Sequence, residues 1–389
     1  MNPTMFKVGV LLQSNEEVGG IYQYCISIIE AAKNMDKKKF EIIFFYSETH
    51  WENEIPIYAE KIKIKKYFFF KILRKVISLF KPSHKILKFF SSYLHEEVVV
   101  INKSDCDIVV MPSQNVASYL VSKKTLSAIH DLMHLYEKKS KEFKYGIFEM
   151  REFHYKALCK HSTSILVDSS MGKNHVINSY NVKKNKIHIL PYCAPPYFKK
   201  KFYFIPKLPK DYIFYPANFW YHKNHLRLIM AFHKVLYIKK NLNLVLCGSK
   251  KDGYEDILSL VKKLGIENKV FFLGRVPNEY MYSLYKNAKL TVFVSLFGPT
   301  NIPPLEAFTI GSPLVCSDVY AMKTQLKNAS VFVDPYNYLS IARGINKILN
   351  NDNLKKNLIS RGKKIARLKS QIFFNKNFEE IIKKVLNVN

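Results

Sequence analysis

The sequence is poor in acidic residues. It has 31 Asp and Glu against 61 Lys and Arg in 389 residues, so its formal net charge is +30. Such an excess concentrates polyanions near a protein, and nucleic acid, an anionic membrane face and phosphorylated substrates are all candidate partners. Glycine is scarce while Lys, Asn and Ile are abundant. A biased genomic base composition therefore explains much of the charge equally well.

Cysteine motifs are absent as well. The six cysteines are dispersed, with no CxxC pair and no His at ligand spacing. This argues against a zinc site or a disulfide framework, and we expect reduced, mostly buried thiols of the cytosolic kind. Asp105-Cys106-Asp107 has the D-x-D form of some metal sites, but it precedes a predicted strand, at that strand's N-terminal end. We expect solvated charges there and no metal cofactor.

Long hydrophobic runs are also missing. The apolar run Val8–Leu12 is too short for the core of a signal peptide and instead predicts a first strand. The apolar stretch 67–80 is interrupted by Lys71, Arg74 and Lys75. We therefore expect neither a secreted nor an integral membrane protein.

The chain does contain short apolar runs that alternate with segments of helical period. This pattern predicts βαβ units and an α/β fold with two Rossmann-like, doubly wound parallel sheets. Helices are predicted from Gly19-Gly20 to about Lys33, near 224–239 and near 254–264. Strands are predicted at 6–12, 40–46, 108–111, 125–129, 164–167 and 187–190, and then at 212–215, 242–247, 270–273, 290–294, 314–316 and 331–333.

The pattern lapses at 199–211, where Pro206 and Pro209 occur without periodicity. We interpret 1–198 as one domain, 199–211 as a linker and 212–389 as a second domain. The helical, basic tail begins near Asn350, and its last helix is expected to pack back on the first domain. Two such domains would face each other across a cleft, with ligands at strand C-termini and helix N-termini.

The stretch 295–318 carries the most chemical information. Pro303 and Pro304 predict a helix start, with Thr300 or Asn301 as N-cap and Gly311 as the C-terminal cap. Free N–H groups and the helix dipole predict an anion site that suits a diphosphate. Glu306, one turn into this helix, can accept two hydrogen bonds from a vicinal diol such as that of ribose.

Ile302–Ala307 and Gly311–Val315 resemble the signature of family 4 glycosyltransferases of the GT-B fold. Val270–Val276 resembles the family strand whose backbone reads the nucleotide base, and Tyr285–Ala288 followed by Leu290–Ser295 also fits. The resemblance covers about 212–349 well and the first half loosely. It departs in the family's E-x7-E pair, whose first glutamate falls on Gly298, so the chain represents a variant branch.

The resemblance assigns donor-binding residues in the second half. Lys223 matches the lysine of the family's phosphate clamp, while Asn218 replaces its arginine. Glu306 is implied to bind ribose and, with Lys223, to act in catalysis. The remaining implied donor contacts are Arg275, Val276, Thr300, Asn301, Ile302 and Pro303, of which Thr300 and Asn301 are candidates to replace the glutamate missing at Gly298.

The first half offers two weaker features. Gly19-Gly20 resembles the family's glycine-rich loop at the donor phosphates, although a simple tight turn is the alternative. His130-Asp131-Leu132 resembles the family's H-D-L turn, which implies that His130 contacts a sugar hydroxyl or transfers a proton. A turn histidine bonded to its neighbours is the alternative. Arg151 is a further candidate for orienting phosphate or acceptor.

Together these features imply a retaining glycosyltransferase. It would move a hexose-type sugar from a nucleoside diphosphate, bound by the second domain, to an acceptor hydroxyl bound by the first, without a metal, in bacterial-type cell-surface glycan assembly such as lipopolysaccharide, capsule or exopolysaccharide. A sugar-nucleotide epimerase and an inactive GT-B partner subunit are the alternatives. A nucleic-acid-binding protein is disfavoured, because the chain has no recognition helix, RNA-binding aromatic motif or zinc knuckle.

Lys61–His95 contains ten basic residues, many aromatic ones and no acid. A helix at 69–80 would gather apolar residues on one face, and such a helix binds an anionic membrane interface. A core helix with solvated lysines and a base-stacking surface are alternatives. We expect a cytoplasmic protein, peripheral on the inner face of the cytoplasmic membrane, that acts on a glycan or lipid-linked acceptor.

Overall fold

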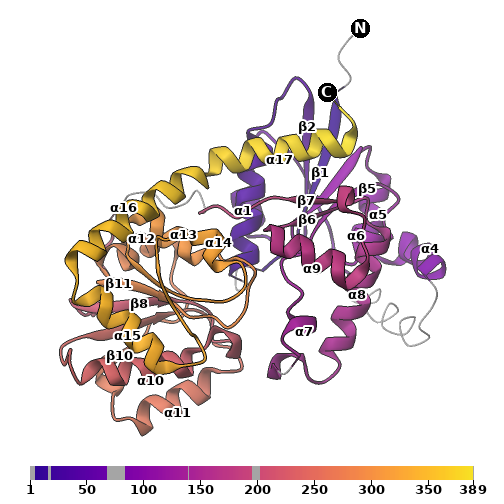
Figure 1. Cartoon of the computed structure of the whole chain (residues 1–389). Coiled ribbons are helices and arrows are strands. Elements are labelled where there is room, and N and C mark those ends of the chain that lie inside the picture. Colours follow the sequence, from indigo (N-terminus) through magenta and orange to yellow (C-terminus); the bar gives the residue numbers. More distant parts are fainter. Residues whose placement is uncertain (1–4, 16–18, 68–83, 139, 195–201, 389) are drawn as a thin grey trace. The chain divides into compact units, whose positions relative to one another are not determined.

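The computed structural model describes residues 5–15, 19–67, 84–138, 140–194 and 202–388. The chain forms two compact units (Figure 1). Unit 1 consists of Met1–Leu132, Phe148–Leu190 and Phe374–Asn389, and unit 2 consists of Met133–Ile147 and Pro191–Phe373.

Unit 1 is built on a seven-stranded sheet of order β3-β2-β1-β4-β5-β6-β7, with every neighbouring pair parallel. The order around β1 and β4 is that of a doubly wound fold, as the sequence predicted. The strands are β1 (Phe6–Leu12), β2 (Phe40–Tyr46), β3 (Glu60–Lys63), β4 (Ile108–Met111), β5 (Lys124–Ala128), β6 (Ser164–Val167) and β7 (Ile187–Ile189).

The edge strand β3 was missed by the sequence analysis. Its sequence EKIK has no apolar run, and its side chains are largely exposed. An edge strand pairs on one side only and tolerates charge, so it lacks the hydrophobic signal on which prediction rests. The other predicted strands agree with the structure within one residue at each end.

The helices of unit 1 follow the βαβ pattern. The helix predicted at 69–80 lies outside the described residues, whereas the end of the same basic stretch forms α4. The helices are α1 (Gly20–Lys33), α2 (Trp51–Glu54), α4 (His84–Leu94), α5 (Glu96–Lys103), α6 (Ala117–Leu120), α8 (Ile147–His161), α9 (Ser170–Tyr180) and α17 (Gln371–Leu386).

Unit 2 has a six-stranded parallel sheet of order β10-β9-β8-β11-β12-β13. The strands are β8 (Tyr212–Pro216), β9 (Asn243–Cys247), β10 (Val270–Phe272), β11 (Leu290–Phe293), β12 (Leu314–Ser317) and β13 (Val331–Val333). The helices are α7 (Met133–Tyr136), α10 (His225–Leu236), α11 (Tyr254–Lys263), α12 (Asn278–Asn287), α13 (Pro303–Ile310), α14 (Met322–Leu326), α15 (Tyr338–Leu349) and α16 (Asp352–Leu368).

Helices cover both faces of the unit 2 sheet. Ile213 and Tyr215 of β8 pack in a core with α10, α11 and α15, whereas the alternate residues Tyr212 and Phe214 pack against α12 and α13. A strand that is buried on both faces reads as a continuous apolar run, which is why β8 was predicted. The two-sided core fixes the sheet and presents the C-terminal ends of its strands for binding.

The units differ in composition from the predicted domains. Residues 133–147 belong to unit 2, although the sequence analysis placed them in 1–198. The reason is long-range bonding, because Tyr320 donates to Glu137 and His222 donates to Glu142. Residues 191–194 likewise belong to unit 2. Phe374–Asn389 belongs to unit 1, in agreement with the expectation that the last helix packs back on the first domain.

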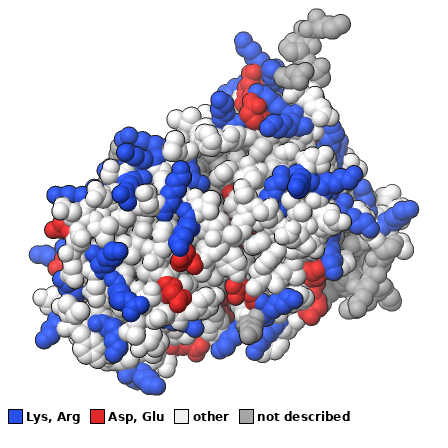
Figure 2. All heavy atoms as spheres, viewed as in Figure 1, with Lys and Arg blue, Asp and Glu red and all other residues white. Residues whose placement is uncertain are grey.

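No helix in the described part of the chain is long and apolar enough to cross a membrane. On the face drawn in Figure 2, Lys and Arg side chains are spread widely rather than gathered in one patch. All six cysteines are free and buried, as the sequence predicted.

Candidate functional site

The switch point of the unit 2 sheet lies between β8 and β11, and it brings Lys223 to the end of β11. Lys223 ends a short 3-10 turn, η4 (Tyr221–Lys223), just before α10, and its ammonium lies 5.4 Å from the centre of the Phe293 ring. The carbonyl of His222 accepts hydrogen bonds from Leu296 N–H at 2.7 Å and from the Ser295 hydroxyl at 3.3 Å. Open α/β sheets bind ligands at such points.

Asn224 fixes this turn, and the sequence analysis missed it. Its backbone is left-handed at φ 63°, and its side chain is buried. Its amide donates to the carbonyls of Val294 at 3.0 Å and Pro335 at 2.8 Å. Asn tolerates this conformation better than most residues. The position of Asn224 directly after Lys223 was the available sequence signal. Its two carbonyl acceptors could not be predicted, because they are distant in sequence.

Asn218 joins the loops after β8 and β9. Its side-chain oxygen accepts a hydrogen bond from Ser249 N–H at 2.8 Å. Beside it, a Cβ added to Gly248 would lie 2.3 Å from the Ala217 carbonyl oxygen, so only glycine permits this approach of the two loops. Asn218 therefore supports the loop that leads to Lys223.

Glu306 is the central carboxylate of unit 2. Only 4% of the residue is exposed, and its Oε2 accepts a 2.5 Å hydrogen bond from the Tyr285 hydroxyl. Burial raises the pKa of the neighbouring Cys247 thiol to about 12, the backbone at Val276 opposes this, and the Glu306 carboxylate adds to the rise. Thus the ends of β9, β10 and the start of α13 converge on one spot.

The start of α13 differs from the predicted cap. The N-cap residue is Ile302 and no side chain caps the helix, so the assignment of Thr300 or Asn301 as N-cap was wrong. Asn301 is instead held by Gln325, which accepts from its N–H at 3.0 Å and donates to its carbonyl at 2.8 Å. Pro303 starts the helix and Gly311 closes it at φ 85°, as predicted.

The same helix start has few N–H donors. Pro303 and Pro304 carry no N–H, and the N–H groups of Leu305 and Glu306 bond the Ile302 carbonyl at 2.8 and 3.1 Å. The free N–H groups predicted for this helix start are therefore largely missing. What α13 offers an anion is chiefly its dipole, so cationic side chains such as Lys223 gain importance.

Gly298 adopts φ 124°, a region that other residues rarely enter. A Cβ built at this position would lie 2.6 Å from the Asn301 amide nitrogen. A glutamate at Gly298 would thus require the loop to move, and Asn301 occupies the space beside it. Thr300 is buried in the same loop, whereas Arg275 lies exposed after β10.

A carboxylate that the sequence analysis did not consider lies next to Lys223. Glu142, in η2 (Lys141–Phe143), accepts from His222 N–H at 3.0 Å and from His222 Nδ1 at 2.9 Å. Burial raises the pKa of Glu142, but the bonds and charge of His222, with Lys223 nearby, outweigh it and lower the pKa. Glu142 is therefore ionised and positions the η4 turn.

In unit 1, the glycine pair opens α1 at the C-terminal side of β1. Gly19 is the N-cap with φ 71°, and a Cβ added to Gly20 would meet no atom within 4 Å. Residues 16–18 lie outside the described part. The pair thus leaves open space beside the helix start.

His130 follows β5, as predicted. Its Nε2 donates to the Pro112 carbonyl at 2.8 Å, which leaves Nδ1 as the acceptor nitrogen of the neutral ring. Burial lowers the pKa of His130, while the Pro112 bond and the Asp131 charge oppose this. Arg151 of α8 donates to Asp131 at 2.7 Å and to the Tyr155 hydroxyl at 3.2 Å, so it joins the H-D-L turn.

The D-x-D segment serves the fold. Asp107 accepts from Lys7 N–H at 2.8 Å, and Asp105 pairs with the Lys7 ammonium at 2.5 Å.

Within the described residues, one group has ligand atoms close enough for a metal, namely His95, Glu96 and Glu97. His95 Nδ1 lies 2.7 Å from Glu97, and Glu96 accepts from Tyr67 N–H at 2.9 Å.

Comparisons with known proteins bear on this site. Residues 199–365 match the family model described as "Glycosyl transferases group 1", and they contain Lys223 and Glu306. The chain is 27% identical over 242 residues to an uncharacterized glycosyltransferase of Methanocaldococcus jannaschii, covering 58% of this chain and 60% of the relative. It is 29% identical over 178 residues to an O-antigen chain mannosyltransferase of Salmonella typhimurium, covering 46% and 47%.

A third relative is the N-acetylgalactosamine-N,N'-diacetylbacillosaminyl-diphospho-undecaprenol 4-alpha-N-acetylgalactosaminyltransferase of Campylobacter jejuni, 29% identical over 150 residues, which cover 37% of this chain and 39% of the relative. The chain thus spans between 39% and 60% of these relatives' lengths. Among solved structures, HepE of Anabaena in complex with UDP and glucose matches with a TM-score of 0.70 and 15% identity, over 97% of this chain and 99% of that one.

The structural similarity establishes the fold, which is GT-B with two Rossmann-like, parallel-sheet domains, as the sequence predicted. Residues 199–365 are thus similar to glycosyl transferases group 1, and the three relatives named above are glycosyltransferases.

Proposed function

We propose that this protein is a retaining glycosyltransferase that moves a hexose from a nucleoside diphosphate to an acceptor hydroxyl. The observation that carries the proposal is the buried Glu306 carboxylate, held by Tyr285 at the start of α13, within the stretch that matches glycosyl transferases group 1. A carboxylate has about four lone-pair sites, so one that already accepts from Tyr285 can also accept from the ribose diol of a nucleotide.

Charge stabilisation at the diphosphate would come from Lys223 and the dipole of α13. Developing negative charge on a leaving diphosphate is stabilised by preorganised cations and dipoles without a metal. Glu142 supports this arrangement because it holds the neighbouring His222. No carboxylate nucleophile is assigned, because the corresponding position is Gly298. The other implied donor contacts remain part of the proposal: Gly19, Gly20, Asn218, Arg275, Val276, Thr300, Asn301, Ile302 and Pro303.

The acceptor is proposed to be a lipid-linked glycan of cell-surface polysaccharide assembly. Relatives named for O-antigen synthesis and for a diphospho-undecaprenol-linked substrate support this class. The basic stretch Lys61–His95 would bring the enzyme to the anionic inner face of the cytoplasmic membrane. In its described end, α4 exposes Ile86, Phe89 and Tyr93, which suit an interfacial helix.

A thermal-shift screen with UDP, GDP, ADP and their sugars tests the donor assignment. A ligand that binds only the folded state at 100 times its Kd stabilises it by about 2.7 kcal/mol. We expect one base to raise Tm in the wild type and far less in Glu306→Ala, with Glu255→Ala, an exposed glutamate of α11, as control. Absence of any shift would contradict the proposal, and nucleotide release without an acceptor would indicate the epimerase.

Vesicle co-sedimentation tests the membrane assignment. The protein should pellet with anionic vesicles at low salt and be partly released at high salt, because screening weakens headgroup contacts. Replacing Lys71, Arg74, Lys75 and Lys81 with Glu should abolish pelleting without unfolding the protein. Equal pelleting by this variant and the wild type would remove 61–95 from the interface.

A further inference from the structure

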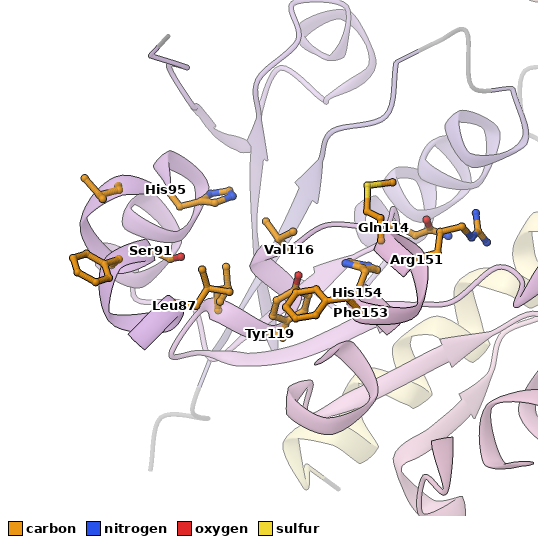
Figure 3. A pocket seen from close by; sticks show the side chains of 13 residues that line it. Leu87, Ser91, His95, Gln114, Val116, Tyr119, Arg151, Phe153 and His154 are labelled. Atoms are coloured by element: carbon orange, nitrogen blue, oxygen red, sulfur yellow. The ribbon is translucent and has the colours of Figure 1, made fainter. Parts of the chain in front are cut away.

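Unit 1 contains a cavity of about 510 Å³ between α4 and α8 (Figure 3). A volume of this size is typical of small-molecule sites. Its walls are mainly apolar, and none of the described side chains that line it is acidic. No residue assigned to donor binding takes part. The cavity therefore requires an explanation of its own.

Helix α4 lines the cavity with one face and exposes aromatic rings on another. Leu87, Ser91 and Leu94 line the cavity at helical spacing, whereas Phe89 and Tyr93 are 62% and 66% exposed. The α8 side of the cavity is similar, because Met150 and Phe153 line it and are 64% and 60% exposed. Exposed apolar surface that continues into a cavity is unusual for a soluble surface and is typical of a site for an apolar ligand.

One end of the cavity is polar. Figure 3 shows Gln114 and Arg151 at the opposite end from Leu87 and Ser91. Both side chains donate to the Tyr155 hydroxyl, so they lie together. Arg151 also bonds Asp131, next to His130. The polar end thus adjoins the turn to which acceptor contact is assigned.

The middle of the cavity favours an uncharged occupant. His154 lines it, and its Nε2 is buried without a hydrogen-bond partner. Burial first, and the Arg151 charge second, lower the pKa of His154 to about 4, so the ring is neutral at pH 7. The cavity thus runs from an apolar wall past the neutral His154 ring to the Arg151 guanidinium. A ligand with a hydrocarbon chain and an anionic head matches this order.

We propose that this cavity binds the polyprenyl chain of the lipid-linked acceptor, with its phosphate end at Gln114 and Arg151. The assignment rests on the proposed transfer to a lipid-linked glycan. The chain would enter over the exposed residues of α4 and α8, which lie at the bilayer surface when the enzyme is bound. The glycan would then follow the phosphate past the His130 turn.

Calorimetric titration with defined probes tests the assignment. Geranylgeranyl diphosphate, below its micelle concentration, should bind saturably to the full-length wild type. Geranylgeraniol, which lacks the phosphates, and hexadecyl phosphate, which has a straight chain, should each bind at least fivefold more weakly. Equal or tighter binding of hexadecyl phosphate would overturn the choice of a polyprenyl chain.

Two variants locate the binding. Ser91→Phe fills the cavity from α4, and Phe153→Ser removes an exposed ring at its mouth and should not disturb folding. Both should weaken geranylgeranyl diphosphate at least tenfold, while Phe204→Ser, an exposed ring in unit 2, should not. Unchanged binding by Phe153→Ser, or no binding by the wild type, overturns the assignment.

The same protein is titrated with the nucleotide sugars. Nucleotide binding without isoprenoid binding would refute the cavity assignment and leave the proposed function intact. Isoprenoid binding at the cavity without any nucleotide binding would refute the proposed function, and the cavity would remain a lipid-phosphate site.

Discussion

Replacing Glu306 tests the donor site most directly. The residue is 4% exposed, and its carboxylate accepts a hydrogen bond from the Tyr285 hydroxyl. A carboxylate has about four lone-pair sites, so it can accept from a ribose hydroxyl as well. Hydrogen bonds to a charged group contribute about 1.5–3 kcal/mol. Glu306→Ala should therefore weaken nucleotide binding by roughly 10- to 150-fold. Glu306→Gln keeps an acceptor without the charge and should lose less.

The same change affects folding, and the two effects must be separated. Glu306→Ala removes the 2.5 Å acceptor of the buried Tyr285 hydroxyl, which also lies 3.4 Å from the Pro303 carbonyl. An unsatisfied buried group costs about 1–3 kcal/mol of stability. Titrations should therefore be run well below Tm. Tyr285→Phe keeps the ring, which packs edge-on against Phe214 at 5.0 Å, and removes the hydroxyl alone.

Isothermal titration with the nucleotide found in the screen is the assay. We expect affinity in the order wild type, Tyr285→Phe, Glu306→Gln, Glu306→Ala, with Glu255→Ala equal to wild type. Tyr285→Phe should lose no more than about 1.5 kcal/mol, because the carboxylate stays. Wild-type affinity in a folded Glu306→Ala protein would refute the ribose assignment.

Three further predictions concern other residues. Lys223→Ala should lower kcat because it removes about 3–4 kcal/mol of transition-state stabilisation, whereas Tm should stay nearly unchanged. Steady-state kinetics with Lys250→Ala as the control variant measures this effect. A wild-type kcat in Lys223→Ala would exclude Lys223 from the site. His130→Ala should keep nucleotide affinity and impair transfer, and the opposite pattern in titration and turnover would place His130 at the donor. His225 is buried, and its pKa is lowered to about 3, chiefly by that burial. Only the unfolded chain then gains this proton as pH falls from about 6.5 towards 3, so stability falls by up to ~1.4 kcal/mol per pH unit. In urea unfolding at pH 7 and pH 5, His225→Phe should lose less stability than the wild type, and equal losses would contradict this.

Local pattern was sufficient for every strand except the edge strand β3, and for the helix that holds Glu306. The strands of unit 2 are buried on both faces, so they read as apolar runs separated by amphipathic helices. Proline and glycine mark α13 at both ends through their backbone restrictions. Strand β3 was not predicted, because an edge strand needs no apolar run and its sequence has none.

Contacts between distant residues could not be predicted in this way. Tyr285 reaches Glu306 across 21 positions, and Glu142 reaches His222 across 80. Neither pair has a spacing that local periodicity would reveal. The grouping of 133–147 with unit 2 follows from such contacts.

The sequence by itself determined the fold class and the position of Glu306, because both depend on local periodicity and on backbone chemistry. Only the tertiary structure decided which partners hold the site. It showed that Asn301 is held by Gln325 instead of capping α13. It also brought α4 and α8 together around the cavity. These outcomes depend on chain packing in three dimensions, where residues far apart in sequence compete for the same space and the same hydrogen-bond partners.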